Sequence, residues 1–245
     1  MRFKNILGGK QRASIESIQS DFVSLASHQL RTPLSAIKWY TEMLLAQRQG
    51  KLAEKQVQYL REIYRSNERA INLVNDLLDV SRIQEGQIHL ELRSARVEDV
   101  IKEIMDNFGT LIKASQVSVD FEIVGGPLPK VEIDREKLKR VIVNLLSNSV
   151  KYTLAKGKIK ITVEKNQHYI KISVKDSGIG IPKADQAKVF EKFFRSVNVI
   201  KHSPDGTGLG LFIARSLVNA MGGKIDFTSD EGRGTTFYVT LPLKQ

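Results

Sequence analysis

Cysteine is absent from the 245 residues of this sequence. Its absence excludes disulfide bonds and thiolate-bound metals, and it fits a reducing cytoplasm. The sequence also lacks an apolar run near the roughly 18 residues that cross a bilayer, and it lacks a signal peptide. We therefore expect a cytoplasmic protein, or the cytoplasmic part of a membrane receptor whose sensor segment lies upstream.

A dense basic block is also missing, although the formal net charge is +11. The lysines and arginines are spread along the chain, without the interleaved aromatic residues of a nucleic-acid surface. The charge is compatible with acidic partners, phosphorylated ligands or an anionic membrane surface. We expect no binding to nucleic acid.

The hydrophobic share of 41% is ordinary for a globular protein, and the length fits two domains. Residues 1–14 form a basic lead-in that Gly8-Gly9 interrupts. A helix is predicted from about Ala13 to Gln47, with a short turn and a second helix directly after it. We therefore predict an antiparallel helical hairpin over residues 15–86, followed by a domain of mixed type over residues 87–245.

A seam with spacings of three and four residues runs along the second helix through Val57, Leu60, Tyr64, Asn67, Ile71, Val74, Leu78 and Ser81. Ile63, Ala70 and Leu77 widen this stripe beyond what one hairpin can bury. We predict that two chains pair into a homodimeric four-helix bundle, in which Asn67 helps to fix the register. A coiled-coil spacer without chemistry would have the same pattern.

A histidine stands near a proline in the first helix, in the run Ser27-His28-Gln29-Leu30-Arg31-Thr32-Pro33-Leu34. The helical rhythm places Gln29 on the buried stripe and His28 at its solvent edge, with Thr32 one turn further on the same face as His28. Pro33 removes a backbone donor and predicts a bend just after the histidine. Taken alone, the pattern is typical of a surface histidine beside an incidental kink.

The rhythm changes near Glu85-Gly86, and the second domain begins. Its predicted elements are a strand at 88–92, a helix at 97–114, a strand at 117–124, a helix that Asp134 caps and that ends near Tyr152, strands at 158–164 and 169–175, a helix at 208–221 and a hairpin at 224–242. Helices on one face of an antiparallel sheet make an α+β fold.

Four segments of this domain predict a nucleotide site. On the helix that follows Asp134, Asn144 and Asn148 lie four residues apart on one face. Asn148 is a neutral oxygen ligand suited to Mg²⁺ already bound to phosphates, Lys151 can meet phosphate charge, and Tyr152 can stack on a base. Two asparagines on a helix are by themselves more typical of capping or solvation.

Asp176 follows a strand, where its carboxylate can accept a hydrogen bond from an adenine amine. Gly178 and Gly180 let the backbone pass close beneath the ring. A run of phenylalanines that ends in Arg195 introduces a polar stretch, 196–205, which is typical of a mobile lid. The phenylalanines can dock the lid base against the core, and Arg195 can reach a γ-phosphate.

The fourth segment is a glycine-rich run that opens a helix, Gly206-Thr207-Gly208-Leu209-Gly210. Free backbone N–H groups and the positive end of the helix dipole suit phosphates at this position. The run lacks the Gly-Lys-Ser/Thr of a P-loop, and it follows a loop and not the first strand of a parallel βαβ unit.

In this order, the four segments and the run from Glu231 to Thr235 resemble the nucleotide-binding boxes of sensor histidine kinases. The run from Ser27 to Leu34 resembles the phosphoacceptor box of the same family. The resemblance covers nearly the whole chain from about Ile15. It implies the catalytic core of a two-component sensor kinase, with an all-α dimeric hairpin followed by an α+β sandwich of the GHKL ATPase type.

By this resemblance, His28 is the phosphoacceptor, Asn148 the Mg²⁺ ligand with Asn144 supporting it, and Asp176 the adenine contact. The phosphate-side loop then consists of Gly206, Thr207, Gly208, Leu209 and Gly210, and Thr235 belongs to the last box. The implied cofactors are ATP and Mg²⁺. The implied partners are a second copy of the chain and the receiver domain of a response regulator, whose aspartate takes the phosphoryl group from His28 and from which Thr32 helps to remove it.

Gln29 departs from the family pattern, which has Glu or Asp directly after the histidine. Glutamine can hold the imidazole tautomer but cannot take up its proton. The sequence therefore leaves two hypotheses, a slow kinase and a signalling scaffold that binds ATP with little autokinase activity. An ATPase that uses water would need a glutamate where Asn144 stands. Lys192 and Asp205 are milder departures, at positions where arginine and glycine are frequent.

Overall fold

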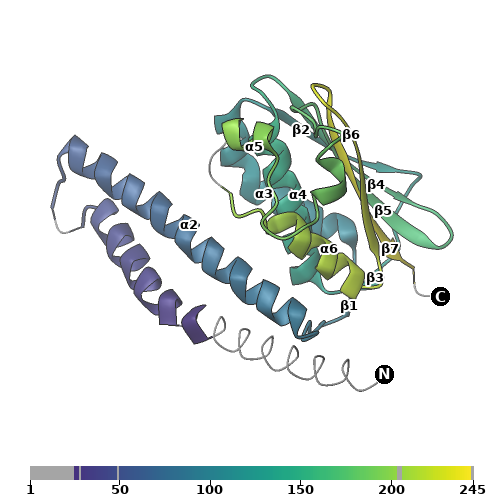
Figure 1. The fold of residues 1–245 in the computed structure, drawn as a ribbon, viewed down its shortest axis with the longest axis horizontal. Coiled ribbons are helices and arrows are strands. Elements are labelled where there is room, and N and C mark those ends of the chain that lie inside the picture. The colour runs from purple at the N-terminus through teal and green to yellow at the C-terminus, as the bar shows by residue number, and fades with distance from the viewer. Residues whose placement is uncertain (1–24, 28, 49, 203–205, 244–245) are drawn as a thin grey trace, which may run out of the picture. The chain divides into compact units, whose positions relative to one another are not determined.

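The computed structural model describes residues 25–27, 29–48, 50–202 and 206–243. His28 and the predicted lead-in therefore lie outside the described residues. The chain divides into two compact units, Met1–Gln87 and Ile88–Gln245, and each is described by itself (Figure 1). None of the helices in the described ranges is both long and apolar enough to cross a bilayer.

The first unit is a helical hairpin (Figure 1). Its first helix comprises the described residues 25–27 and 29–45, and α2 spans Glu54–Gln84. At the start of α2, Gln56 Oε1 accepts the Ala53 N–H over 2.8 Å, which satisfies a donor that the helix itself leaves unpaired. The predicted pair of helices joined by a short turn is confirmed.

Every predicted seam residue of α2 is buried or half-buried, so the seam is confirmed. The predicted burial of Gln29 is wrong, because this side chain is exposed, and Leu25, one turn earlier, is also 63% exposed. The face that packs on α2 includes Ser27 and Thr41, which are 3% and 4% exposed. The apolar rhythm of the first helix therefore marks a face that the hairpin leaves open, and not the face toward α2.

Further large apolar side chains stay uncovered on the hairpin. Ile37, Leu44 and Ile63 are 43%, 44% and 47% exposed. Their exposure agrees with the prediction that the stripes are wider than one hairpin can bury.

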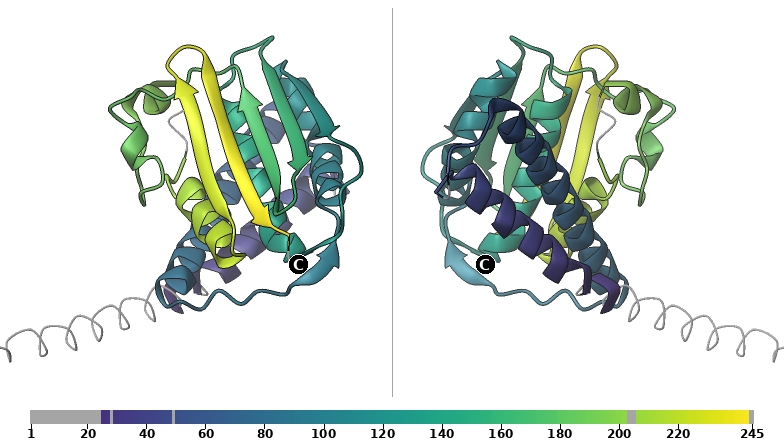
Figure 2. Two further views of the ribbon diagram at one scale, coloured as in Figure 1. Left: turned by 90° about the vertical axis from the view of Figure 1, so that its right-hand side faces the viewer. Right: turned by 90° about the vertical axis from the view of Figure 1, so that its left-hand side faces the viewer.

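The second unit contains a five-stranded sheet with helices on one face (Figure 2). The strands run in the order β2-β4-β5-β7-β6, with bounds Ser118–Val124, Lys158–Lys165, Tyr169–Asp176, Gly234–Pro242 and Lys224–Asp230. The helices are α3 (Val97–Ser115), α4 (Arg135–Tyr152) and α6 (Gly210–Ala220). The α+β fold is confirmed. The sheet is mixed and not antiparallel, because β2 pairs with β4 in parallel through a long crossover that includes α4.

The predicted strand at 88–92 is wrong. These residues have no regular structure, and the strand β1 forms later, at Arg93–Ala95, against β3 at Val131–Ile133. The Glu91 N–H donates to Asp134 Oδ2 over 3.0 Å, so this backbone donor serves the region of the α4 cap and not a strand ladder. The strand β3 has three residues, too few to give a periodic signal.

The core fixes α4 against the sheet. Asp134 caps the helix, since its Oδ1 accepts the Lys137 N–H over 3.0 Å. Fully buried side chains from α4 and the neighbouring strands β4 and β5 include Leu138, Ile142, Leu145, Ile159, Ile161, Ile170 and Ile172. One stripe of α4 is held in this core. The orientation of its other faces, which carry predicted site residues, is therefore fixed.

Candidate nucleotide-binding site

Asp176 is the buried centre of the candidate site. It ends β5 and is 7% exposed. Its Oδ1 accepts the backbone N–H of Gly178 over 2.9 Å and that of Thr235 over 3.1 Å. Among the residues that the structure describes, its Oδ2 accepts only the Ser149 hydroxyl, at a long 3.4 Å. One carboxylate oxygen is thus fixed by the backbone, while the other keeps capacity to accept a hydrogen bond from a ligand.

Burial raises the pKa of the Asp176 carboxyl above its ordinary value, and the two backbone N–H groups oppose that rise. Hydrogen bonds to a carboxylate favour its charged form. The local structure therefore supports a buried acceptor at the end of β5.

Backbone hydrogen bonds join the loop after Asp176 to two other segments. The Ile179 N–H donates to the Tyr152 carbonyl at the end of α4 over 3.1 Å. The Gly232 N–H, from the turn between β6 and β7, donates to the Ile179 carbonyl over 2.8 Å. These bonds bring the end of α4, the loop 177–180 and the turn 231–233 together.

Two glycines are sterically required in this arrangement. Gly180 has φ +67°, and a Cβ there would lie 2.1 Å from the Asp230 carbonyl oxygen. Gly234 has φ +109°, and a Cβ there would lie 2.1 Å from the Asp176 carbonyl oxygen. Any side chain at either position would push the two loops apart.

Serine and glutamine side chains that the sequence analysis missed complete these loops. Ser229 Oγ accepts the Ile181 N–H over 2.8 Å, and Gln186 Nε2 donates to the Ile181 and Ser229 carbonyls, both over 3.0 Å. Ser149 lies on a different face of α4 from Asn144 and Asn148, and its hydroxyl reaches Asp176. A serine in the buried stripe of α4 is the signal that could have found it, because a buried hydroxyl needs a partner.

The outward face of α4 carries the predicted polar residues. Asn144 Nδ2 donates to the carbonyl of Gly210, the first residue of α6, over 3.2 Å. Asn148 is half-buried, and within the described part of the chain its side-chain amide has no hydrogen-bond partner. Asn144 therefore ties α4 to the glycine-rich run, whereas the amide of Asn148 is available to a ligand.

Positive charge gathers beside the glycine-rich run. Arg195 Nη1 donates to the Gly206 carbonyl over 3.2 Å. Lys151 Nζ lies 5.5 Å from the centre of the Tyr152 ring, and a Cβ built on Gly206 would lie 3.1 Å from the same ammonium. Burial raises the pKa of the Tyr152 hydroxyl, an effect that the Arg195 charge opposes, so the ring is neutral at pH 7. Two cations and an uncharged ring suit a phosphate-bearing aromatic ligand.

The prediction that the glycine-rich run opens a helix is confirmed, because α6 begins at Gly210. Leu209 is fully buried and anchors the run, and the Leu209 N–H donates to Thr207 Oγ1 over 3.2 Å. The run therefore leads into the fixed N-terminus of α6, which is the positive end of the helix dipole.

The stretch predicted as an irregular lid contains the short helix α5 at Val197–His202. Of the preceding phenylalanines, Phe190 docks on the sheet, with ring centres 5.8 Å from Phe227 and 6.5 Å from Phe237. Phe193 does not dock, since it is 60% exposed. The aromatic anchor is confirmed for Phe190 and is wrong for Phe193.

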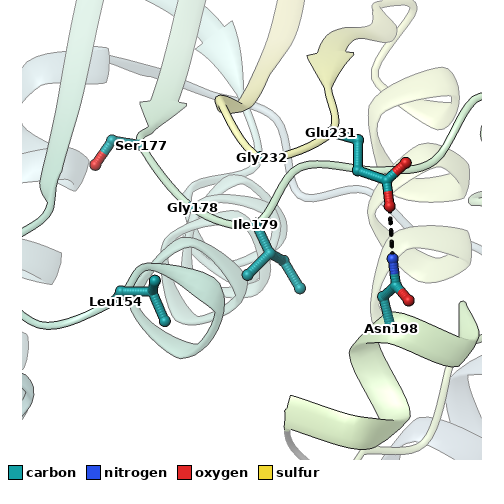
Figure 3. A pocket seen from close by; sticks show the side chains of 7 residues that line it. All are labelled: Leu154, Ser177, Gly178, Ile179, Asn198, Glu231 and Gly232. Carbon is teal, nitrogen blue, oxygen red and sulfur yellow. Dashed lines mark hydrogen bonds between the residues drawn. The ribbon is translucent and has the colours of Figure 1, made fainter.

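A pocket of about 320 Å³ opens beside the loop after Asp176 (Figure 3). On one side, Asn198 Nδ2 of α5 donates to Glu231 Oε1 over 2.8 Å, and Leu154 lies on the other side (Figure 3). Its lining residues are Leu154, Ser177, Gly178, Ile179, Asn198, Glu231 and Gly232. The bond from Asn198 to Glu231 connects the lid segment with the turn that reaches Asp176 through Thr235.

The predicted site residues thus fall into two groups. The contacts above connect those of the second unit. They lie on α4, on the loop from Asp176 to Gly180 and on the run from Gly206 to Gly210. Gln29 and Thr32 are both exposed on the hairpin unit.

The fold and these contacts define the second unit as an ATPase domain of the histidine kinase type. Residues 133–245 match the family described as histidine kinase-, DNA gyrase B-, and HSP90-like ATPase. Residues 18–86 match the His Kinase A (phospho-acceptor) domain. The chain belongs to the sensor histidine kinase family.

Named relatives agree with this assignment. Sensor histidine kinase WalK of Bacillus subtilis (strain 168) is 35% identical over 239 residues, which are 96% of this chain and 38% of WalK. The crystal structure of full-length ShkA in complex with AMPPNP has a TM-score of 0.76 at 26% identity, over 92% of this chain and 46% of that one. Histidine kinase ThkA in complex with response regulator protein TrrA has a TM-score of 0.64 at 26% identity, over 100% and 67%. The chain spans less than two fifths of the length of the curated relatives that it matches.

Proposed function

We propose that this chain is the ATP-dependent core of a protein-histidine kinase, which phosphorylates itself on His28 and passes the phosphoryl group to an aspartate of a response regulator. The observation that carries the proposal is the Asp176 network. Its buried carboxylate keeps one oxygen for a purine amine, and the loop that follows it is hydrogen-bonded to the end of α4. Two similar structures, one of a kinase in complex with AMPPNP and one of a kinase in complex with a response regulator, add support.

Each end of the nucleotide then has its own residues. Asp176 accepts from the adenine amine, with Gly178 and Gly180 beneath the ring and Tyr152 available for stacking. Lys151, Arg195 and the run from Gly206 to Gly210 meet the phosphates with charge and backbone N–H groups.

The residues also fit a Mg²⁺ ion carried by the phosphates. Asn148 offers an amide oxygen that no described protein group uses. Hard cations prefer such oxygen ligands. When bound, the ion neutralises phosphate charge, and Asn148 is the residue that would hold it. Asn144 fixes the start of α6 through its bond to the Gly210 carbonyl.

In the transfer step, a ring nitrogen of His28 forms a bond to the γ-phosphorus as the bond to the leaving oxygen of ADP breaks. Gln29 orients the imidazole through its amide oxygen but takes up no proton, so the proton leaves to water or to the nucleotide. Thr32, one turn further along, positions water for removing the phosphoryl group from the regulator. The phosphorylated imidazole in turn gives its phosphoryl group to the regulator's aspartate.

The proposed partners follow from the hairpin unit. The open apolar face with Ile37, Leu44 and Ile63 is covered by a second copy of the chain, which completes a four-helix bundle. The proposed parts are a lead-in at 1–14, the dimerising hairpin at 15–86 and the ATP-binding domain at 87–245, acting in the cytoplasm as part of a longer sensor. The ATP-binding domain must approach His28 for each transfer, with hinges near Glu85-Gly86 and Pro33.

Incubation with γ-labelled ATP and Mg²⁺ tests the proposal. We expect acid-labile label on the wild-type chain, none on His28→Ala, and wild-type label on His89→Ala, which alters an exposed histidine elsewhere. ATP binding without label would favour the signalling scaffold, for which Gln29 is the specific argument. Absence of both binding and label would refute the proposed function.

A further inference from the structure

Two asparagines on α2 hydrogen-bond to the first helix within the run from Ser27 to Leu34. We propose that Asn67 and Asn75 are positioning residues that hold the turn Arg31–Leu34, and with it the presentation of His28. The role of the two asparagines in catalysis rests on the proposed function, whereas their role in holding the turn does not.

Two side-chain hydrogen bonds carry the inference. Arg31 Nη2 donates to Asn75 Oδ1 over 3.0 Å, and Asn67 Nδ2 donates to the Leu34 carbonyl over 2.8 Å. Both bonds are partly buried, and both run between the two helices of the hairpin. Arg31 and Leu34 are three residues apart, so the bonds hold one turn of helix near its two ends.

This turn needs support from outside because Pro33 lies inside it. Proline has no backbone N–H, so the carbonyl of Gln29, four residues earlier, loses its ordinary helical donor. The first helix nevertheless continues through Pro33 to residue 45. A turn with fewer bonds of its own bends more easily, and the bonds from α2 limit that bending.

An asparagine at position 67 supplies this bond at the expense of the stability of the folded state, which argues that it has a specific role. It is 5% exposed, and among the described residues its Oδ1 has no hydrogen-bond partner. A buried acceptor without a partner destabilises the folded state. The surrounding seam is apolar, with Val74 and Leu78 also buried, so a leucine would suit packing better than an asparagine does.

The next two contacts along the hairpin are of a different kind. Lys38 and Glu68 form an ion pair of 3.0 Å, and the Tyr64 hydroxyl donates to Glu42 over 3.2 Å. Their side chains are more exposed, and exposed pairs contribute little. The partly buried hydrogen bonds that the asparagine side chains make with Arg31 and Leu34 are therefore the ones that fix the turn.

Hydrogen exchange in the full chain tests the holding role without any need for catalysis. We expect Asn75→Ala and Asn67→Leu to speed amide exchange in the peptide covering 29–38 by about tenfold, the range for losing a hydrogen bond of this kind. Asn75→Asp should restore slow exchange, because a carboxylate accepts from Arg31 at least as well. Asn72→Ala is the matched control, since Asn72 is exposed on the same helix.

Activity tests the positioning role. At saturating ATP, both loosening variants should label His28 at least about fivefold more slowly, with calorimetric ADP affinity unchanged, because the nucleotide contacts lie in the other unit. The thermal midpoint of Asn67→Leu should not fall, which separates positioning from stability. Unchanged exchange in both loosening variants overturns the holding role, and faster exchange with unchanged labelling overturns the positioning role. If the wild type takes no label at all, the proposed function fails, and the exchange result alone still decides the holding role.

Discussion

Thr235 donates its backbone N–H to Oδ1 of Asp176 over 3.1 Å, although 59 residues separate them in the chain. The same oxygen also accepts from Gly178. A carboxylate held in this way has a fixed orientation before any ligand arrives, and such preorganisation lowers the cost of binding.

Asp176→Asn should remove nucleotide affinity while keeping the fold. The asparagine oxygen can still accept from Gly178 and Thr235, but its NH₂ group then faces the position of the adenine amine, where two donors oppose each other. We expect calorimetric affinity for ADP to fall at least about tenfold, with an unchanged circular dichroism spectrum. Asp120→Asn, at an exposed position of β2, is the control. Equal affinity in Asp176→Asn and the wild type would remove Asp176 from the site.

The pH dependence of binding follows from the raised pKa of Asp176. Because burial raises the folded-state pKa above the unfolded value, the folded state binds a proton more readily, and stability decreases as pH rises between those two pKa values. Protonation also removes the acceptor, so ADP affinity should decrease as pH falls toward the raised pKa. Titrations at a series of pH values should show this decrease in the wild type. They should show a flatter profile in Asp176→Asn.

Asn148→Asp should impair ATP use although it keeps the size of the side chain. The change places a negative charge beside the triphosphate and alters the environment of Mg²⁺. Stability should not change much, because no described protein group bonds the Asn148 amide. Calorimetry with ATP and Mg²⁺ gives the measurement, and Asn107→Asp, exposed on α3, makes the same charge change elsewhere. Wild-type affinity and wild-type labelling in the variant would contradict the role of Asn148.

The parts of the fold that the sequence predicts well have long periodic patterns. The strands β4 to β7, the capped helix α4 and the α2 seam are all of this kind. The parts that it misses are short or depend on distant neighbours. β3 has three residues, and the parallel pairing of β2 with β4 depends on the crossover between them.

The candidate site divides in the same way. Asp176, Asn148 and the glycine-rich run can be found because their residue types suit a nucleotide. The contribution of Ser149 cannot be read from spacing alone, since its partner belongs to another element. The burial of Gln29 is predicted wrongly for a related reason. The apolar rhythm of the first helix cannot say which of its faces meets α2 and which is left for another partner.

Gln29→Glu should speed labelling of His28 by at least about tenfold, a fraction of the ~10²–10⁴-fold range of general base catalysis. A carboxylate can take up the imidazole proton during attack, whereas the amide cannot. The substitution should fold normally, because Gln29 is exposed. Initial rates across pH 6 to 9 are the measurement, with Gln58→Glu, exposed on α2, as the control. Equal rates at every pH would mean that Gln29 does not limit the reaction.

The apolar face of the hairpin should hold two chains together. We expect the full chain to sediment as a dimer at micromolar concentration, and a fragment of residues 1–86 to do the same. Ile37→Glu combined with Ile63→Glu places charges on surface that the dimer would bury, and should give monomers. Arg61→Glu, at an exposed position of α2, should remain a dimer. A folded, monomeric wild type would contradict the four-helix bundle.

The place of β7 in the sheet has a consequence for the order of events during synthesis. Although it is the last strand in sequence, β7 lies between β5 and β6, and it begins beside the residue that donates to Asp176. While a ribosome is still making residues 234–242, one edge of β5 has no neighbour and the Asp176 carboxylate lacks one of its two backbone donors. A nascent chain should therefore acquire the capacity to bind nucleotide only after residues 234–242 have been made, in one step with closure of the sheet.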